Sequence, residues 1–489
     1  MSDNTFLADD VQIRIYPSPE GIGYAQNTEM LALQGEDPHS GHPEGLVLSS
    51  DWSVSVGGHE VPVYAVPVTR GGPHSFAGFD YVGDFRPVSI IARSAHEIES
   101  ATIRPRSLGI NCHIVDNEVR FTVDKPCHLV IETNDGIQRP LTISVNPPEK
   151  YVPDRRDPNV LWFGPGIHQI DPIELTDNQT IYIEGGAILQ ANQPSPEEAP
   201  VVETDWAGKA IYRDLLSSHK TTGIRIHGRG IIDTSGLDWH ARKPIFLGHC
   251  SDVKLEGITI TGASHWTVHM LNCTNAEVDN LKLYGYRENS DGIDIVSSRN
   301  VTVRNCFVRT GDDAVCVKAM IKPPAHGGKD ILVEKCVVWN DKVRCFGIAS
   351  ENISDIEDVV FRDCDIIRSY ADWTEELGSL CVIICDSGTV TNVLFEDMRI
   401  EHEVKYALNC TIMKDRWSST TQPGQIRDIV FRNIQIPKGV PSRFHGYDKE
   451  HMVENIRVER LQVGDTIIRD LQQADFRVNQ FVSSIKLSY

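Results

Sequence analysis

Three aspartates, Asp291, Asp312 and Asp313, stand in short glycine-flanked turns within the stretch NSDGIDIVSSRNVTVRNCFVRTGDDAVCVK, residues 289–318. A segment rich in Val separates the single acid from the tandem pair. Carboxylates that are held close together raise the pKa of at least one of them, as a general acid requires. Paired carboxylates with divided roles are the usual machinery for cleaving glycosidic bonds. These acids therefore suggest glycosidase chemistry, provided that the fold brings them together.

The elements that must position the acids form a repeat. Each unit has a polar Asn or Asp followed by apolar residues at alternating positions, and units begin about every 24 to 36 residues. This period is typical of a solenoid, and the alternation indicates strands rather than helices. We therefore expect a right-handed parallel β-helix from about residue 160 to 480. The aligned units are SDVKLEGITI (251–260), a weaker copy NAEVDNLKLY (275–284), RNVTVRNCFV (299–308), KDILVEKCVV (329–338), EDVVFRDCDI (357–366), TNVLFEDMRI (391–400), RDIVFRNIQI (427–436) and ENIRVERLQV (454–463).

One column of the repeat contains Cys306, Cys336 and Cys364 at equivalent positions. The other units have Ile, Met or Leu there, so we expect the thiols to lie buried, one above another, as small hydrophobic side chains. They lack the short spacing and polar neighbours of metal ligands.

Stacked coils place residues one winding apart side by side, about 4.8 Å apart along the axis. Asp291 and Asp312 are 21 residues apart, which is one short winding, and Asp313 follows directly. The three carboxylates are therefore expected to converge on one surface. A single aspartate at such a turn more often satisfies backbone groups of the turn. The aspartates interpreted in that way are Asp294, Asp330 and Asp358.

The N-terminal part has a different pattern. Its short alternating strands are broken by Gly, Pro and Asp-Gly and show no 25-residue period, which predicts an antiparallel β-sandwich. The Pro-rich and charged segment VNPPEKYVPDRRDPN (145–159) predicts the boundary. We expect an all-β chain with a sandwich over residues 1–155 and a β-helix catalytic domain over residues 156–489.

Composition limits the partners. The net charge of −21 argues against nucleic acid and anionic membranes. No stretch approaches 18 apolar residues, and the N-terminus lacks the basic and apolar regions of a secretory signal. Twelve cysteines without a CxxC pair do not suggest a disulfide scaffold. We expect a cytoplasmic enzyme with no cofactor and no metal, acting on an oligosaccharide, with homo-oligomerisation left open.

NSDGID and GDDAVCVK, followed by GIASE at 347–351, resemble the polygalacturonase-like glycoside hydrolases of family 28, over residues 160–480. That family has NTDG, a DD pair about 21 residues later, a GHG-containing stretch and then RIK; the first two motifs match here in type and spacing. The run ending in Lys318 is similar to that of the exo-acting branch. Related family 49 dextranases carry an N-terminal β-sandwich, although their acids are usually spaced slightly closer.

The resemblance implies that Asp312 protonates the leaving oxygen and that Asp291 and Asp313 activate water. It also implies inversion of the anomeric configuration. Carboxylates on adjacent windings are close, and a short separation by itself favours retention. We follow the family, because two acids can hold one water together.

Two departures from the family bear on the substrate. Arg344 stands where the family has the His of GHG; it cannot act as a base but can donate a forked hydrogen bond. The RIK motif, which grips the galacturonate carboxylate, is replaced by GSLCVIICDSG (378–388), which offers Asp386 and no cation. An acid there repels a uronate, so we expect a short, neutral, α-linked oligosaccharide and exo action.

Further substrate-binding residues are expected near these turns. His265 and Trp266 end the winding before the acids, and Trp373 lies in a polar insert, where exposed Trp is a natural platform for sugar stacking. Lys318 and Glu351 follow acid-bearing or glycine-rich turns and are expected to hydrogen-bond sugar hydroxyls. For the aromatic residues, packing of their own loops is the competing interpretation.

Three alternatives stay open. One is an oligogalacturonide hydrolase. Another is a β-helix polysaccharide lyase or epimerase, which needs a cation or Ca²⁺ at the uronate carboxylate and a basic residue. The third is a non-catalytic carbohydrate-binding β-helix, as in tailspikes. Release of reducing sugar by the wild type but not by Asp312→Asn separates the hydrolases from the rest.

Overall fold

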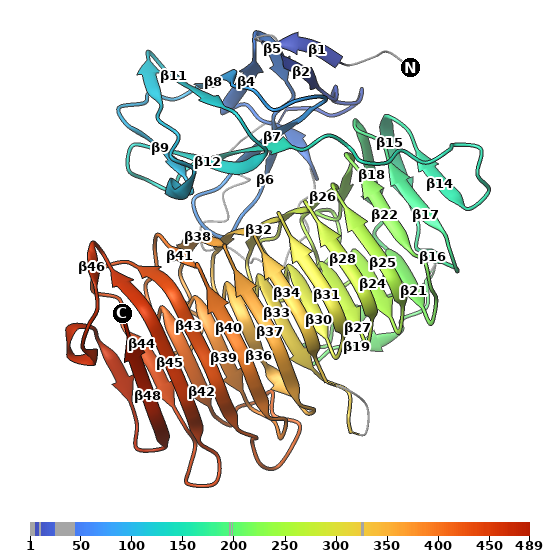
Figure 1. Cartoon of the computed structure of the whole chain (residues 1–489). Helices are drawn as coiled ribbons and strands as arrows, with labels where there is room; N and C mark the ends of the chain where they lie inside the picture. Colours follow the sequence, from blue (N-terminus) through green and yellow to red (C-terminus); the bar gives the residue numbers. More distant parts are fainter. Residues whose placement is uncertain (1–4, 9–10, 25–44, 195–196, 198, 324–326) are drawn as a thin grey trace.

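The computed structural model describes residues 5–8, 11–24, 45–194, 197, 199–323 and 327–489. It confirms the expected fold: a β-sandwich rests on a long parallel β-helix (Figure 1). The last strand of the sandwich, β13, ends at Asn146, and the first strand of the β-helix, β14, begins at Val160. None of the helices among the described residues is long and apolar enough to cross a membrane.

The β-helix consists of a 22-stranded sheet and an 11-stranded sheet that are parallel almost throughout. In the larger sheet, each coil contributes up to two strands. The first series is β14 (Val160–Phe163), β17 (Thr180–Ile183), β22 (Arg225–Gly228), β25 (Ser251–Glu256), β28 (Thr274–Asp279), β31 (Arg299–Arg304), β34 (Lys329–Glu334), β37 (Ile356–Arg362), β40 (Val390–Glu396), β43 (Ile426–Ile436), β45 (Val453–Val463) and β48 (Val482–Ser488). The second series is β15 (Gly166–Ile170), β18 (Ala187–Ala191), β23 (Ile231–Asp233), β26 (Thr259–Thr261), β29 (Lys282–Tyr284), β32 (Phe307–Thr310), β35 (Val337–Asn340), β38 (Asp365–Ser369) and β41 (Arg399–Ile400). Strand β46 (Thr466–Ile467) pairs antiparallel with β45.

The 11-stranded sheet forms the side of the β-helix that carries the site. Its strands are β16 (Ile173–Leu175), β21 (Leu216–His219), β24 (Ile245–Gly248), β27 (Val268–Leu271), β30 (Ile293–Val296), β33 (Val315–Ala319), β36 (Phe346–Asn352), β39 (Leu380–Ile384), β42 (Leu408–Ile412), β44 (Ser442–His445) and β47 (Phe476–Val478). A separate hairpin of β19 (Glu203–Thr204) and β20 (Ala210–Ile211) is inserted before β21. A short 3-10 helix, η3 (Leu471–Gln473), lies near the C-terminus.

The structure explains why each unit of the repeat has an Asn or Asp near its start. This residue adopts a left-handed backbone in successive coils, with φ of 56° at Asn275, 50° at Asn300, 53° at Asp330 and 58° at Asp358. Asn and Asp tolerate this conformation better than other residues with side chains. The amide of Asn300 donates to Asn275 Oδ1 of the coil below at 2.7 Å. Asp330 and Asp358 adopt the left-handed conformation inside β34 and β37, so the interpretation of them as turn residues is wrong.

The interior column of the repeat is also confirmed. Cys306, Cys336 and Cys364 have no exposed surface and belong to one continuous hydrophobic core. The backbone N–H of Cys336 donates to Cys364 Sγ of the next coil at 3.4 Å, so the two are stacked. Each of the twelve cysteines, all of which lie in the described residues, is a free thiol.

The N-terminal domain has two sheets that enclose a core of their own. One contains β1 (Thr5–Ala8), β2 (Val11–Arg14), β3 (Val47–Leu48), β6 (Tyr64–Val66), β7 (His74–Tyr81), β9 (Ala101–Arg104), β12 (Cys127–Thr133) and β13 (Leu141–Asn146); the other contains β4 (Trp52–Val56), β5 (His59–Val61), β8 (Val88–Ser94), β10 (His113–Val115) and β11 (Glu118–Val123). A 3-10 helix, η2 (Arg106–Leu108), follows β9. The sheets are antiparallel except that β13 pairs with β7 in parallel.

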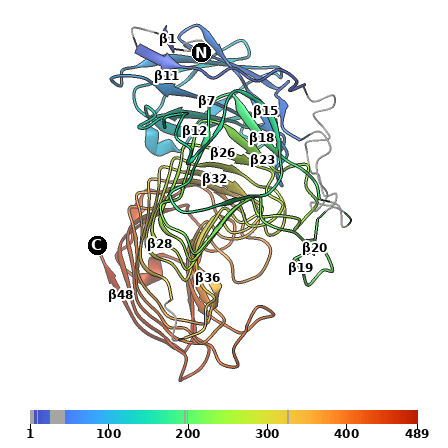
Figure 2. The same ribbon diagram turned by 90° about the vertical axis from the view of Figure 1, so that its right-hand side faces the viewer.

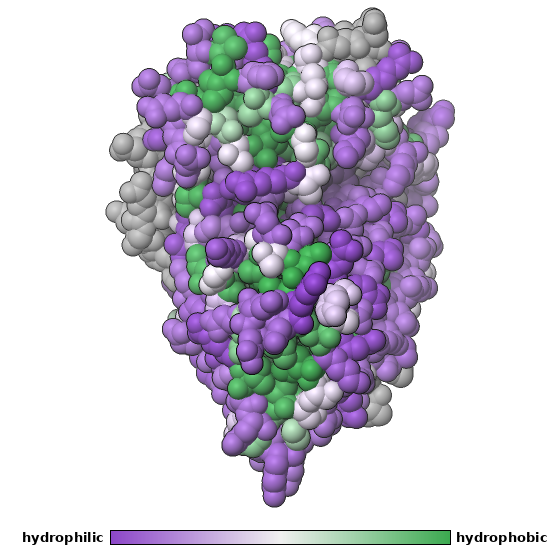
Figure 3. Space-filling model, turned by 60° about the vertical axis from the view of Figure 1, so that its left-hand side comes forward, coloured by the Kyte–Doolittle hydropathy of each residue, from purple (hydrophilic) through white to green (hydrophobic). Residues whose placement is uncertain are grey.

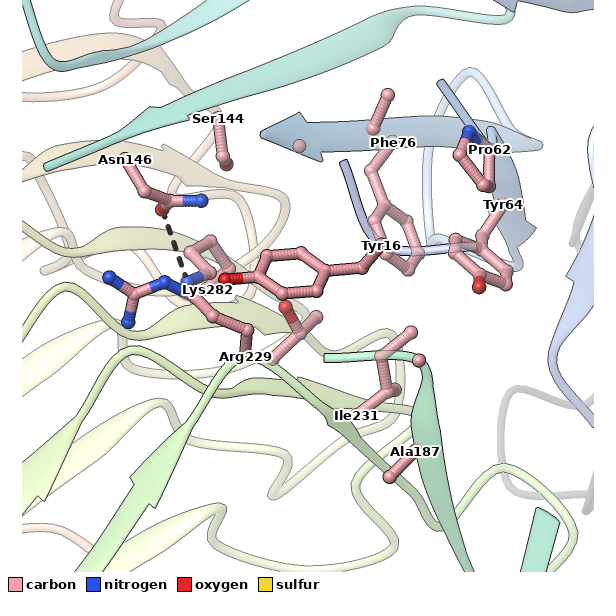
Figure 4. Close-up of a pocket in the computed structure, with 14 residues that line it drawn as sticks. Tyr16, Pro62, Tyr64, Phe76, Ser144, Asn146, Ala187, Arg229, Ile231 and Lys282 are labelled. Carbon is pink, nitrogen blue, oxygen red and sulfur yellow. Dashed lines mark hydrogen bonds between the residues drawn. The ribbon is translucent and has the colours of Figure 1, made fainter. Parts of the chain in front are cut away.

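The two domains share a buried interface. Phe76 of the sandwich stacks on Tyr284 of the β-helix with ring centroids 4.7 Å apart. Arg309 of the β-helix, with no exposed surface, lies 2.7 Å from His74 Nδ1 of the sandwich and 3.2 Å from Asp341. A small cavity of about 70 Å³ lies in the same interface, where Figure 4 shows Lys282 beside Asn146. The face shown in Figure 3 is mostly hydrophilic and carries several apolar patches.

Candidate active site

The structure brings Asp291, Asp312 and Asp313 together. They stand in the turns just before β30 and β33, which are neighbours in the 11-stranded sheet. Each carboxylate offers an oxygen that lies within 4.8 Å of the other two. All three side chains are buried, and all three line a cleft of about 1080 Å³. The sheet register thus provides the convergence that the spacing suggested.

The turn that carries Asp312 is fixed by backbone and side-chain hydrogen bonds. The carboxylate accepts from the N–H of Asn289 at 2.9 Å and from the N–H of Asp313 at 2.8 Å. The amide of Asn340 donates to the carbonyl oxygens of Asp312 at 2.5 Å and of Arg344 at 3.1 Å. A residue of the next coil therefore ties the turn of the acids to the turn of the arginine.

Two cations neutralise part of the cluster. Lys318 Nζ lies 2.9 Å from Asp291 Oδ2, 3.8 Å from Asp313 Oδ2 and 3.8 Å from the ring centroid of Trp266. Arg344 Nε lies 3.1 Å from Asp313 Oδ1. Among the described residues, no ion pair reaches Asp312. The three acids therefore differ in their electrostatic environment although they share one site.

The electrostatics separate the acids further. Burial, with added repulsion from Asp291 and Asp313, raises the pKa of Asp312 well above its usual range. Burial also raises the pKa of Asp291, to about 6, with Lys318 opposing the rise. Despite burial, the surrounding carboxylates, led by Asp291, raise the pKa of Lys318 well above its ordinary value, so the ammonium stays charged.

Asp294 was interpreted as a turn residue, and that is wrong. It lies within β30, has no exposed surface, and its Oδ1 is 2.9 Å from Lys318 Nζ. Burial raises the pKa of Asp294 well above its usual range. The sheet register pairs it with Cys316 of β33, the strand that follows Asp312 and Asp313. Asp294 therefore belongs to the charged cluster and anchors Lys318.

Most of the other expected residues line the same cleft: His265, Trp266, Lys318, Arg344, Glu351 and Trp373. The nearby ring of His265 accepts from the N–H of Trp266 at 2.7 Å and stacks on His240 at 4.7 Å. Burial lowers the pKa of His265 well below its ordinary value, so the ring is neutral. Trp266 is in contact with Lys318 and can hold that ammonium over the acids.

Asp386 does not line the cleft. It is fully buried, and its Oδ1 accepts from the N–H groups of Ser419 at 2.6 Å and Thr420 at 2.7 Å. The carboxylate therefore holds the loop after β42 and is unavailable to a sugar. Although that position carries no cation, the cleft does contain cations away from the acids, because Lys243 and Arg416 line it.

Several residues of the cleft were missed by the sequence analysis. His240 Nε2 lies 3.0 Å from Asn289 Oδ1, and its other ring nitrogen contacts the carboxylate of Asp205. Trp206 and Arg416 line the cleft from distant loops. None of them belongs to the repeat, so no periodic signal marks them. The local signals are the run DWHARK at 238–243 and the polar insert KDRWSSTTQPG at 414–424, whose Trp417 was expected, like Trp373, to stack on sugars and does line the cleft.

Three convergent carboxylates can also act as ligands of a divalent cation. Here Lys318 and Arg344 already lie against two of the three carboxylates. Positive charge at this site is thus supplied by side chains of the chain itself.

The comparisons of sequence with known proteins concern mainly the β-helix. The model of the family "Glycosyl hydrolases family 28" matches residues 161–439. The endo-polygalacturonase of Pectobacterium carotovorum subsp. carotovorum is 28% identical over 178 residues, which are 30% of this chain and 44% of that protein. The matched segments span less than half the length of the first curated relatives.

Solved structures resemble the fold. Dex49A from Penicillium minioluteum aligns with a TM-score of 0.64 at 13% identity and covers 100% of both chains, so the likeness includes the sandwich. An exopolygalacturonase from Thermotoga maritima aligns with a TM-score of 0.52 at 18% identity, covering 67% of this chain and 84% of that one. At these identities the likeness concerns architecture alone.

Proposed function

Because this chain belongs to glycosyl hydrolases family 28, we propose that it hydrolyses α-glycosidic bonds at the ends of short oligosaccharides. The observation that carries the proposal is the buried group of three carboxylates on the cleft floor, of which two contact cations and one does not. This arrangement supplies a protonated and an ionised carboxyl group at neutral pH, as glycosidic hydrolysis requires.

Asp312 is the general acid. Its raised pKa keeps the proton on the carboxyl group until the glycosidic oxygen leaves. Asp291 and Asp313, stabilised by Lys318 and Arg344, are the pair that activates water. The water oxygen bonds to the anomeric carbon as the bond to the leaving oxygen breaks. The proton of Asp312 goes to the leaving oxygen, and a proton of the water goes to the pair.

Inversion follows from the way in which water is held. Asp291 Oδ1 accepts no hydrogen bond from any described residue, so it can accept one from a water. The short separation of the oxygens by itself favours a nucleophilic carboxylate and retention. Asp291 is, however, held by Lys318 at 2.9 Å, which weakens it as a nucleophile and leaves it able to orient water.

A neutral sugar fits the charge of the cleft. The described lining contains eight carboxylate side chains and four Lys or Arg, and two of those four cations already contact the acids. An oligogalacturonide is the second candidate. It is favoured by Lys243 and Arg416, which line the cleft away from the acids, and by the relatives that are named polygalacturonases. The buried free thiols fit a reducing compartment such as the cytoplasm.

The test compares oligogalacturonides with neutral α-linked gluco- and galacto-oligosaccharides, with product size followed over time. We expect faster hydrolysis of a neutral series and release from one end of the chain. A preference for oligogalacturonides selects the second candidate, and early mid-length fragments contradict exo action. The anomeric configuration of the first product, read by NMR, distinguishes inversion from retention. Absence of hydrolysis in all series contradicts the proposal.

A further inference from the structure

The β19–β20 hairpin is a long insertion that reaches the cleft. It lies between β18 and β21, and its residues Glu203, Asp205 and Trp206 line the cleft. Asp205 shapes the tip by accepting from the N–H groups of Ala207 at 2.7 Å and Lys209 at 2.8 Å. The same aspartate contacts the buried ring of His240, which latches the hairpin onto the coil of the active site.

The hairpin meets a loop from the far end of the sheet. Trp206 lies 5.9 Å from Trp239, which precedes β24, and 6.3 Å from Trp417, which follows β42. In the sheet, β24 and β42 are separated by β27, β30, β33, β36 and β39. At about 4.8 Å per strand, those two strands lie about 29 Å apart. The loop after β42 therefore extends back over the strands between them.

The strands that are crossed include those of the acids, because the catalytic turns precede β30 and β33. Figure 2 shows the hairpin and the orange loops of the later coils projecting from the same side of the β-helix. The contact between Trp206 and Trp417 thus forms part of a cover over the cleft that holds Asp312, and both residues line that cleft.

The cover presents sugar-binding groups to the cleft. The guanidinium of Arg416 lies 4.6 Å from the ring centroid of Trp417, 5.6 Å from that of Trp373 and 6.0 Å from that of Trp206. Indole faces stack on the C–H faces of sugar rings, and a guanidinium supplies several N–H donors for hydroxyl groups. Three loops that are distant in sequence thus bring together the groups that bind a pyranose.

Exposure separates a binding role from loop packing. Trp239, which does pack its loop, is 5% exposed, whereas Trp206 is 61% exposed although it lies in the cleft. A tryptophan whose role is to hold the hairpin down is expected to be buried like Trp239. The hairpin has another anchor, the contact between Asp205 and His240. Trp206 is therefore available to a ligand.

We infer that Trp206, together with Arg416 and Trp417, forms an outer subsite that binds a pyranose ring of the oligosaccharide beyond the two rings at the cleaved bond. The inference rests on the proposed glycosidase function. The subsite selects substrates of more than two sugars, and the cover prevents long polymers from lying through the cleft.

The experiment measures kcat and KM of the wild type and Trp206→Ala on a disaccharide and a tetrasaccharide of two series, isomaltose with isomaltotetraose and digalacturonate with tetragalacturonate. For the series that is hydrolysed, we expect KM of the tetrasaccharide to rise about tenfold, as loss of one aromatic contact predicts. The KM of the disaccharide and both kcat values stay unchanged. Trp206→Phe keeps an aromatic face, so its KM for the tetrasaccharide is expected to lie close to that of the wild type.

The control is Tyr151→Ala, which removes an aromatic side chain of matched exposure, 63%, outside the cleft lining. An unchanged KM for the tetrasaccharide in Trp206→Ala overturns the subsite while the glycosidase function stands. An equal rise of KM for the disaccharide and the tetrasaccharide also overturns the subsite, because Trp206 then acts on the catalytic subsites or on the fold. If the wild type hydrolyses neither these four sugars nor any other series of the substrate test, the function itself fails, and the subsite with it.

Discussion

Two buried charged clusters shift the pKa of opposite kinds of group. At the active site, Asp291, Asp294, Asp312 and Asp313 share two cations, and burial raises the pKa of the acids Asp291, Asp294 and Asp312. At the domain interface, Arg229 and Lys282 lie among the carboxylates of Asp80, Glu149 and Asp279. There burial lowers the pKa of Lys282 to about 7. Burial thus disfavours the charged form in both clusters, that of the acids in one and that of a lysine in the other.

The clusters differ in access. The acids line a cleft of about 1080 Å³, whereas the interface cluster adjoins a cavity of about 70 Å³ between the domains (Figure 4). The ammonium of Lys282 donates to Asn146 Oδ1 at 3.4 Å and to the carbonyl of Asn280 at 3.1 Å. A shifted pKa is therefore a sign of function only where a substrate can reach the group; elsewhere it reports a structural contact.

The sharpest test of this contrast is Asp312→Asn. We expect kcat/KM to fall by about 10²–10⁴, since general acid catalysis alone is worth that much. The unfolding midpoint stays unchanged or rises, because one of several repelling acids is removed. Steady-state kinetics and thermal unfolding measure the two effects. The control is Asp330→Asn, at an exposed left-handed position of β34 that tolerates Asn. Wild-type activity of Asp312→Asn on a substrate with a poor leaving group contradicts the assignment.

The matching change at the interface is Asp80→Asn. The carboxylate lies 2.7 Å from Arg229 Nε, and both side chains are 3% exposed. Removing one partner of a buried ion pair costs about 3–5 kcal/mol in free energy of unfolding, because the remaining buried charge loses its hydrogen-bonded counter-ion. Urea unfolding measures it. Asp154→Asn, at an exposed pair with Arg156, is expected to change the free energy of unfolding far less. Equal losses at the two sites contradict the structural role of the interface pair.

The pH dependence of activity is expected to follow Asp291, whose pKa is about 6. Asp291 must be ionised to orient water, so kcat/KM falls below pH 6, by about tenfold per pH unit. Lys318 lowers this pKa. Lys318→Met therefore moves the fall in kcat/KM to higher pH, in addition to any loss of rate. A fall that moves to lower pH, or does not move, shows that another group controls the acidic side of the profile.

The sequence predicts those features of the fold and of the site that follow from the repeat. The repeat fixes which residues face the interior, as Cys306 and Cys336 illustrate, and one winding of spacing indicates that Asp291 and Asp312 meet. These inferences work because adjacent coils are in register, so a spacing along the chain becomes a distance in space.

The remaining parts depend on contacts that have no period. Asp294 in IDIV was interpreted as a turn residue, and nothing local indicates that it meets Lys318. Asp386 binds the backbone of Ser419, 33 residues further along the chain. The approach of Trp206 to Trp417 joins loops that are 211 residues apart. Loop geometry of this kind is set by tertiary packing, which sequence spacing alone does not encode.

The smallest expected effect is that of Lys282→Met on the slope with which the free energy of unfolding changes with pH. Burial lowers the pKa of this lysine from 10.5 to about 7 in the folded protein. Between these values the unfolded chain binds more protons than the folded one, so the free energy of unfolding rises with pH, by at most about 1.4 kcal/mol per pH unit. Methionine cannot titrate, so the variant lacks this contribution.

The measurement is urea unfolding of the wild type and Lys282→Met between pH 7 and 9. The absolute difference at pH 7 mixes the lost hydrogen bonds to Asn146 Oδ1 and Asn280 with the relief of a buried charge, so the slope is the quantity to compare. The stability of the wild type relative to the variant is expected to increase with pH, while kcat/KM on the best substrate stays the same for both, because Lys282 lies outside the cleft lining. Parallel stability profiles show that Lys282 keeps its proton in the folded state. Burial then does not discharge the lysine of the interface cluster, and the parallel with the acids of the active site fails on that side.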